Sequence, residues 1–385
     1  RGRAVDLGLT AFAETLPMLL FGLAAGVFLD RMRRLGRVLI FADLVRSGAF
    51  AFLAFVASPW GPELTVATTA GVILAVAFLV GSMSVLFDSG LQTYMTQSLL
   101  ETDLIRANSQ LGLARTLALS VGPLAGGLAV TLGGGFAVAF SINAFTFIVS
   151  AFFLRFDKPI RSVAARSSEQ FRHAITLGLR ILFADRRLRW GTIGGTMTNF
   201  VFQPLEALLV LFVAQEILGI EKITDVASSE GLAVGGFIAL QAAIGSIGVA
   251  FANRMAKKIP LGTMYIIGLF LLGGGFLTVV IMRNWFAVIP AGIAITGVTW
   301  VNVSLMTLRQ KLAPPDQMGR VIAASRTLAW AGLPLGAALG GILAGKYGII
   351  PVYVLGSCSV IIVTLLLTRT ALCKDKVMAG TVLWK

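Results

Sequence analysis

The sequence predicts an all-α membrane protein built from two related bundles of helices. Hydrophobic residues make up 57% of the 385 residues and charged residues only 13%, which leaves too little polar surface to cover a water-soluble protein of this size. Apolar stretches of about 20 residues, the length at which a helix crosses a bilayer, recur along the chain. The 43 glycines agree with this prediction, because helices in lipid associate through small residues.

About eleven of these stretches are long enough to span a membrane. They lie at about residues 9–29, 38–57, 65–90, 109–132, 135–155, 190–217, 231–252, 261–282, 286–308, 321–345 and 349–371. Most of the loops between them are short, so we expect consecutive helices to be antiparallel neighbours.

The net charge of +14 is concentrated in alternate loops. The basic segments are Arg31–Arg37, Arg155–Arg189, Arg254–Lys258, Arg309–Arg320 and the tail from Arg369. Alternation of this kind follows the positive-inside rule, and it favours a bilayer over a nucleic acid as the partner of the basic residues. We therefore expect a multi-pass protein of the cell (inner or plasma) membrane whose basic loops and C-terminus lie in the cytoplasm.

The chain divides at one long linker. We expect an N-terminal bundle at 1–155 with five visible spans, a cytoplasmic linker at 156–189, a C-terminal bundle at 190–372 with six spans, and a cytoplasmic tail at 373–385. Apolar and Arg residues alternate in the second part of the linker, which predicts a partial helix on the membrane surface. A plain tether is the simpler interpretation of this linker, and a regulatory role is the alternative.

Two long segments repeat each other. The segment from Tyr94 to Gly127 runs parallel to the segment from Ser304 to Gly341, and a shorter resemblance pairs the stretch from Gly26 with the stretch from Gly248. Related halves of similar topology are typical of parallel-repeat transporters. If the halves correspond, the first span pairs with the seventh. We therefore expect the first bundle to lack one N-terminal helix, as in a fragment or a chain with a mispredicted start.

The segment GLAAGVFLDRMRRLGR, from Gly22 to Arg37, resembles the signature between the second and third helices of the major facilitator superfamily. In this resemblance the glycines allow close helix packing, the acidic residue accepts hydrogen bonds at a neighbouring helix end, and the arginines hold the loop in the cytoplasm. The residues expected to act in this way are Gly22, Gly26, Asp30, Arg31 and Arg34.

The segment SVGPLAGG, from Ser120 to Gly127, is similar to the antiporter motif of the same family. Its Gly122-Pro123 pair makes the helix pliable, Gly122 and Gly126 form a face of small residues, and Gly127 completes the motif. Further segments, such as the loop around Pro314 and Pro315, resemble the bacterial branch that contains macrolide efflux proteins and the enterobactin exporter.

The resemblance implies a major facilitator fold of two pseudo-symmetric six-helix bundles around a central cavity, with about eleven spans in this chain. It implies a secondary active transporter, acting as a monomer, that exports small amphipathic compounds by proton antiport with alternating access. Export of siderophores or other metabolites is an alternative, and import by symport and a channel are weaker ones. In a different class, the chain is a transport-inactive scaffold or a truncated product.

Carboxylates inside the predicted spans are candidates for coupling transport to protons. A charged Asp, Lys or Arg at the centre of a membrane helix costs roughly 2.5–3.5 kcal/mol on insertion scales. Asp88 and Glu206 lie near the middle of their spans, so they are our candidates for proton coupling or for holding a cationic substrate. A fixed hydrogen-bond network explains them equally well. Glu14 lies nearer the extracellular end, where it is a gate residue or is simply solvated.

Other polar residues are candidates for the cytoplasmic gate. Asp43 and Arg46 stand one turn apart, where an ion pair can form, and we expect this pair to be mainly structural. Arg115 and Arg326 are related by the repeat. Their symmetry predicts salt bridges at the gate, and extension of the side chains toward lipid headgroups is the alternative.

Five uncharged polar residues are candidates for lining a cavity, and bonds between helices explain them equally well. They are Asn143, Asn199, Gln203, Gln241 and Asn302.

The sequence offers little support for an enzyme or a metal protein. It contains no GxxxxGK[ST], HExxH or GxSxG motif, so we expect no catalytic activity and no cofactor. His173 stands without a neighbouring Cys or second His, and Cys358 and Cys373 are too few for a disulfide framework. We therefore predict no metal site.

Overall fold

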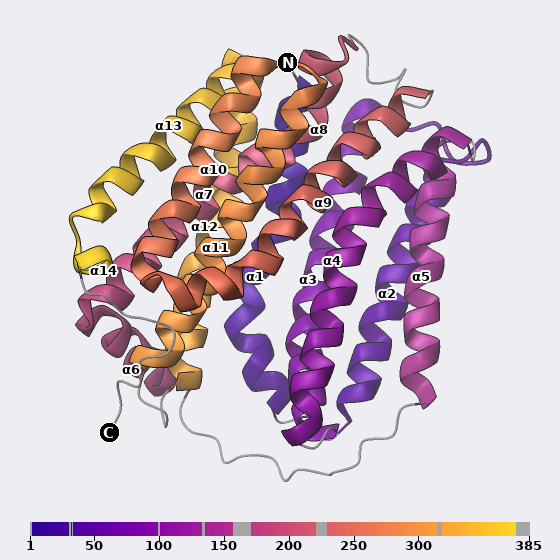
Figure 1. Ribbon diagram of the computed structural model, residues 1–385. Coiled ribbons are helices and arrows are strands. Elements are labelled where there is room, and N and C mark those ends of the chain that lie inside the picture. Colours follow the sequence, from indigo (N-terminus) through magenta and orange to yellow (C-terminus); the bar gives the residue numbers. More distant parts are fainter. Residues whose placement is uncertain are drawn as a thin grey trace. The chain divides into compact units, whose positions relative to one another are not determined.

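The computed structural model describes residues 2–30, 32, 34–98, 101–132, 135–156, 171–220, 229–313 and 318–374. Throughout these ranges the regular secondary structure is helical (Figure 1). In chain order the helices are α1 (Gly2–Asp30), α2 (Leu35–Val56), α3 (Val66–Ser98), α4 (Glu101–Leu132), α5 (Phe136–Phe156), α6 (Phe171–Ala184), α7 (Arg186–Ala207), α8 (Leu209–Phe212), the π-helix η1 (Val213–Ile217), α9 (Ser229–Lys258), α10 (Leu261–Met282), the 3-10 helix η3 (Trp285–Ala287), α11 (Val288–Leu312), α12 (Met318–Tyr347), α13 (Ile349–Thr368) and α14 (Ala371–Lys374).

Each predicted span coincides with helical structure, and the prediction of an all-α membrane protein is confirmed. Within the described residues, nine helices are long and apolar enough to cross a membrane. The helix pair Arg186–Ala207 and Leu209–Ile217 forms a tenth candidate, bent by 45° at a short break. The predicted span at 109–132 lies in α4, whose described apolar part is the shorter segment Val121–Thr131. The chain is therefore a multi-pass membrane protein.

The chain forms two compact units. Unit 1 comprises Arg1–Gly8, Glu169–Gly219 and Phe237–Lys385, and unit 2 comprises Leu9–Ser168 and Ile220–Gly236. Two short segments thus group with the unit that is distant in sequence: the start of α1 with unit 1, and the start of α9 with unit 2. Close backbone crossings explain both groupings. A Cβ atom at Gly8 would lie 2.5 Å from the Cα of Gly341, and one at Gly235 would lie 2.6 Å from the carbonyl oxygen of Pro123.

In unit 2, α2 packs against α3 and α5 (Figure 1). The ring of Phe50 on α2 stacks on that of Phe147 on α5, with centroids 5.9 Å apart. The hydroxyl of Ser47 donates to the carbonyl oxygen of Ala144 at 2.9 Å. Aromatic packing and a buried helix-to-helix hydrogen bond together fix the rotation of α2, and this rotation decides which of its polar residues point inward.

In unit 1, α10 packs against α11 and α13, and α12 packs against α7. Glycines make the closest crossings: a Cβ atom at Gly297 would lie 2.3 Å from the carbonyl oxygen of Gly268, and one at Gly336 would lie 2.0 Å from that of Phe200. No other residue type fits such backbone approaches without movement of a helix. The glycine-rich composition thus serves helix packing, as small residues do in membrane proteins.

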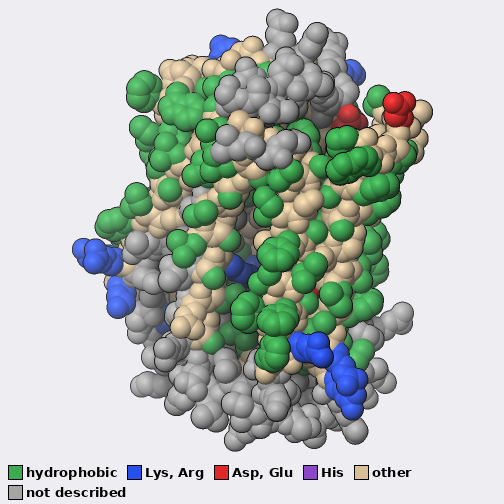
Figure 2. Space-filling view, turned by 90° about the vertical axis from the view of Figure 1, so that its right-hand side faces the viewer, with side chains coloured by type: hydrophobic (Ala, Val, Ile, Leu, Met, Phe, Trp, Pro, Cys, Tyr) green, Lys and Arg blue, Asp and Glu red, His purple; other side chains and the backbone are tan. Residues whose placement is uncertain are grey.

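The outer surface of the helices is largely apolar. Large side chains such as Phe153, Ile281 and Leu366 are more than half exposed, and Figure 2 shows hydrophobic side chains spread over much of the visible face. A water-soluble protein rarely exposes so many large apolar groups together. Lipid is the environment in which this surface is stable.

The predicted partial helix of the linker is α6, while residues 157–170 lie outside the described ranges. Asp185 follows α6 and caps α7. Its carboxylate accepts hydrogen bonds from the backbone N–H groups of Arg187, at 2.7 Å, and Leu188, at 3.2 Å, and from the Arg187 guanidinium at 2.8 Å. Burial alone would raise the pKa of the Asp185 carboxyl, but these hydrogen bonds outweigh it and hold the pKa below its ordinary value.

We predict that Asp185→Ala lowers the free energy of unfolding by about 1 kcal/mol, the usual effect of losing an N-cap. Because the folded-state pKa is depressed, this stabilisation is fully present above the unfolded pKa, about 3.9, and is lost as the pH falls through the folded pKa. Thermal unfolding of the purified protein in detergent, measured from pH 3 to pH 7, checks both statements. Asp185→Asn, which keeps an acceptor oxygen, is the matched control. Equal stability of wild type and Asp185→Ala at pH 7 would refute the capping role.

Candidate functional site

The structure places Asp88 and Arg115, two candidate residues that are 27 positions apart in the sequence, next to each other. Nη2 of Arg115 on α4 lies 3.4 Å from Oδ1 of Asp88 on α3. Both belong to unit 2, and their side chains are 58% and 54% exposed. Charged groups on a spanning helix are stable only where they meet water or other polar groups. This face of α3 and α4 is therefore suited to an aqueous path rather than to lipid.

The Asp43–Arg46 pair lies in the interior of unit 2. The Arg46 guanidinium donates to Oδ1 of Asp43, and the rings of Phe87 and Phe147 flank it, each with its centroid 4.4 Å away. Oδ2 of Asp43 and Nε of Arg46 are buried without a hydrogen-bond partner. Aromatic rings on α3 and α5 thus flank the pair in the core of the bundle.

Glu14 projects from α1 with an exposed side chain. Its backbone lies against α3, since a Cβ atom at Gly81 would come within 2.1 Å of the carbonyl oxygen of Glu14. Asp88 stands seven residues after Gly81 on the same helix, or about 10 Å along its axis at 1.5 Å per residue. Unit 2 therefore carries Glu14 and Asp88 on two helices that cross closely.

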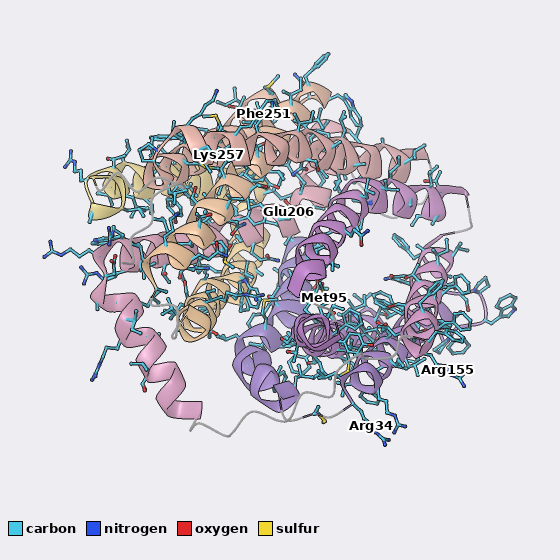
Figure 3. All side chains as sticks on the ribbon, turned by 60° about the horizontal axis from the view of Figure 1, so that its bottom comes forward. Arg34, Met95, Arg155, Glu206, Phe251 and Lys257 are labelled. Atoms are coloured by element: carbon cyan, nitrogen blue, oxygen red, sulfur yellow. The ribbon has the colours of Figure 1, made fainter. Side chains whose placement is uncertain are left out.

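Glu206 lies in unit 1 at the bend between α7 and α8 (Figure 3). Its Oε2 atom is buried and has no hydrogen-bond partner. Pro204, two residues earlier, lacks the N–H group that a helix interior uses, and the backbone continues through α8 into the π-helix η1. The Tyr353 hydroxyl on α13 donates to the carbonyl oxygen of Leu205 at 2.5 Å. A half-buried glutamate with one enclosed, unpaired carboxylate oxygen thus stands where its own helix is irregular.

Two arginines of unit 1 have contrasting surroundings: Arg326 is exposed and Arg309 is buried. The Arg326 guanidinium on α12 lies over the ring of Trp330, 4.1 Å from its centroid. Arg309, near the end of α11, is 6% exposed, and its Nε and Nη2 atoms are buried without a partner. In the sequence Arg309 is recognisable only as part of a basic segment, because its position near a helix end gives no sign that the side chain turns inward.

The glycines of the antiporter-like motif have different neighbours. A Cβ atom at Gly127 would lie 2.8 Å from the carbonyl oxygen of Gly231 on α9, whereas nothing lies within 4 Å of that position at Gly122 or Gly126. Together with the contact between Pro123 and Gly235 described above, this makes Gly127 the crossing point of α4 and α9. The expected face of Gly122 and Gly126 is not the one used in this crossing.

The signature loop is only partly described. Nothing lies within 4 Å of a Cβ atom at Gly22. Gly26 and Asp30 belong to α1, but the surroundings of Gly26, the side chain of Asp30 and the whole of Arg31 lie outside what the structure describes. Arg34, just before α2, and Arg155, in the last turn of α5, are exposed and lie at the same end of unit 2 (Figure 3). This end is the basic end of the unit.

The five amide residues that are candidates for lining a cavity have different surroundings. Nδ2 of Asn199 on α7 donates to the carbonyl oxygen of Ala329 on α12 at 2.9 Å, which is a bond between helices. Gln241 is buried with Oε1 unpaired, Asn302 is exposed, and Asn143 and Gln203 are half-buried. Among the described residues, no group of three or more His, Cys, Asp or Glu side chains is placed to hold a metal ion.

Comparison with known proteins adds a family and a fold. The model of the Major Facilitator Superfamily matches residues 3–337. The multidrug efflux pump Tap of Mycolicibacterium fortuitum is 27% identical over 362 residues, which cover 90% of this chain and 83% of the pump. The putative bacilysin exporter BacE of Bacillus subtilis is 29% identical over 193 residues, which cover 47% of this chain and 46% of the exporter.

The match to this exporter thus spans about half of its length. Among solved structures, the nucleoside transporter NupG (D323A mutant) superimposes with a TM-score of 0.72 at 13% identity, covering 95% of this chain and 90% of the transporter. At that identity the likeness shows the fold alone.

Proposed function

The chain belongs to the major facilitator superfamily, and on that premise we propose that it exports small amphipathic compounds from the cell in exchange for protons. Its family and fold are those of small-molecule transporters and not of enzymes. The similarity to an efflux pump and to a putative exporter supports export as the direction. The exchange would proceed by alternating access, in which the substrate site opens to one side of the membrane at a time.

The proposal of proton exchange depends on one observation, the buried Oε2 atom of Glu206 that has no hydrogen-bond partner. Burying a charged carboxylate without a partner is costly, so this side chain is expected to be neutral while Oε2 is enclosed. It would release its proton when water reaches it. A group that binds a proton in one conformation and releases it in another is what proton antiport requires.

The helix around Glu206 supports this role. Pro204 removes one backbone hydrogen bond, the α7–α8 pair bends by 45°, and π-helical segments such as η1 occur frequently at functional sites. A broken helix changes shape at lower cost than a regular one. The carboxylate thus stands at the point of its span where movement would expose it.

Asp88 is the weaker coupling candidate. Its Oδ1 atom lies 3.4 Å from an Arg115 nitrogen, and both side chains are more than half exposed, whereas Oε2 of Glu206 is buried without a partner. We propose that Asp88 and Arg115 instead line the aqueous path in unit 2 and help to control its opening.

We propose that the basic end of unit 2 faces the cytoplasm. Arg34 and Arg155 share that end, and the positive-inside rule assigns such residues to the cytoplasmic side. The even number of spans from α7 to the end of α13 then brings the C-terminus to the cytoplasm of a cell (inner or plasma) membrane. We propose further that the protein acts as a monomer, with its substrate, protons and lipid as its partners.

The first test is the efflux of a panel of macrolides, dyes and siderophores from cells that express the chain, with and without a protonophore. We expect reduced accumulation of some of these compounds, lost when the proton gradient is dissipated. A symporter would raise accumulation, and an inactive scaffold would leave it unchanged. Either result would refute the proposal, while selective efflux of siderophores would assign export to that narrower class.

A further inference from the structure

Helix α6 has an inward and an outward face, and the proposed function assigns a role to neither. Gly178 and Leu182, one turn apart, are buried, and α6 packs against α12 and α7. Thr176, Arg180 and Phe183 recur at helical spacing and are exposed. The outward face therefore carries an arginine one turn away from an aromatic ring.

The end of α6 and the start of α7 form a corner of defined geometry. Nη1 of Arg189 in α7 donates to the carbonyl oxygen of Phe183 in α6 at 3.4 Å. The Asp185 carboxylate, between the two helices, accepts hydrogen bonds from the Arg187 guanidinium and from two backbone N–H groups of α7. We define the α6–α7 corner by its exposed residues Arg180, Phe183 and Arg186.

The arginines of the α6–α7 corner carry positive charge that the described residues do not neutralise. Within the described ranges, no carboxylate forms an ion pair with Arg180 or Arg186. The carboxylate of Asp185, which lies closest to them along the chain, is engaged by Nη2 of Arg187 at 2.8 Å. An anion supplied from outside the chain is therefore the electrostatic complement of this corner.

The corner lies at a basic end of unit 1. Helix α14 follows α13 and packs against α7 and α10, and a Cβ atom at Gly191, near the start of α7, would lie 3.7 Å from Leu372 of α14. The start of α7 and the end of α13 therefore meet at this end, where Figure 1 also shows α6. Further exposed cations of this end are Lys257 and Lys258 in the last turn of α9 and Arg369 directly after α13.

The apolar outer surface of unit 1 gives way to cations at the same end. Leu365 and Leu366, in the last turn of α13, are 54% and 61% exposed, and the exposed Arg369 follows the helix. Apolar side chains of a spanning helix face the hydrocarbon, and flanking cations lie among the headgroups. Helix α6 has 14 residues, or about 21 Å, which is too short to cross a hydrocarbon core of about 30 Å. The corner is thus placed to lie among the headgroups.

We propose that the α6–α7 corner binds anionic phospholipid headgroups. Arg180 and Arg186 contact the headgroup phosphates, since the planar fork of donors in an arginine matches two phosphate oxygens. The ring of Phe183 enters the boundary between headgroups and acyl chains, as the apolar face of a surface helix does. The binding depends on the location of the protein in a membrane and not on the proposed exchange of protons.

The test compares two lipids that differ in headgroup charge. Native mass spectrometry of the purified full chain in a neutral detergent measures the binding of phosphatidylglycerol and of phosphatidylcholine with the same acyl chains. We expect wild type to bind phosphatidylglycerol about tenfold tighter than phosphatidylcholine. The double variant Arg180→Gln/Arg186→Gln should bind the two lipids within about twofold of each other. Both substituted side chains are exposed, so the variant should fold.

Lys257→Gln/Lys258→Gln is the matched control, because it removes the same charge from the end of α9 in the same unit. It should keep most of the preference for phosphatidylglycerol, and Phe183→Ala should weaken both lipids alike. The proposal is overturned if wild type binds both lipids equally, if the corner variant keeps its preference, or if the control loses it to the same extent. Wild-type affinity of Phe183→Ala for both lipids would overturn the insertion of the ring.

A soluble anion is the other source of the same phosphate chemistry. Glycerophosphoglycerol, the headgroup of phosphatidylglycerol without its acyl chains, is added to wild type in large molar excess over the lipid. We expect it to leave the lipid bound, because the acyl chains hold the headgroup at the membrane surface and contact Phe183. Full displacement of phosphatidylglycerol would identify a soluble phosphate compound as the ligand and overturn the lipid site.

Discussion

Glu206→Gln abolishes transport driven by a pH gradient, because the amide cannot bind and release the proton that the gradient moves. We expect purified protein in proteoliposomes to lose all substrate accumulation in response to an imposed pH gradient. Exchange of labelled for unlabelled substrate in the absence of a gradient should persist, since it needs no net proton movement. Stability should be unchanged or slightly higher, because Oε2 of Glu206 has no partner in the described structure to lose.

Glu216→Gln is the matched control for this variant. Glu216 belongs to the same broken span, but its side chain is 27% exposed and its Oε2 atom lies 3.9 Å from Nη1 of Arg283. The control removes one carboxylate from η1 and should leave gradient-driven transport in place. Undiminished gradient-driven transport by Glu206→Gln would reject Glu206 as the coupling residue.

Replacing Gly127 by leucine is expected to abolish transport, and replacing it by alanine to weaken the fold measurably. At Gly127 even a Cβ atom would lie 2.8 Å from the carbonyl oxygen of Gly231, and backbone atoms cannot move aside as the end of a side chain can. Overpacking of this kind costs about 1–3 kcal/mol, so we expect Gly127→Ala to lower the free energy of unfolding by that amount. Gly127→Leu would separate α4 from the start of α9.

Gly126 provides the control one residue away. Its Cβ position has nothing within 4 Å, and alanine is favoured over glycine in a helix by about 1 kcal/mol, so Gly126→Ala should be neutral or stabilising. Unfolding in a denaturing detergent and dye efflux, measured for both alanine variants and for Gly127→Leu, test the crossing. Equal effects at the two positions would show that the α4–α9 approach does not depend on Gly127.

The fold class follows from features that can be read locally. A run of apolar residues long enough to cross a bilayer specifies a helix wherever it occurs, because lipid leaves backbone groups no other partner. Basic loops, the repeat and the signature around Asp30 are also contiguous in the sequence, so they identify the family without knowledge of packing. The hydrogen bonds that Asp185 accepts at the start of α7 also join residues that are close in sequence, but only the structure shows their geometry.

The sequence by itself therefore determined that this protein is an all-α, multi-pass membrane protein of the major facilitator superfamily. It also showed that two carboxylates, Glu206 and Asp88, lie near the middle of predicted spans. Only the tertiary structure decided that Asp88 contacts Arg115, that Arg309 turns inward, and that Gly127 rather than Gly126 meets α9. These facts depend on how each helix is rotated about its axis. In a helix that is apolar on every side, no polar face reveals that rotation, and only packing against neighbouring helices sets it.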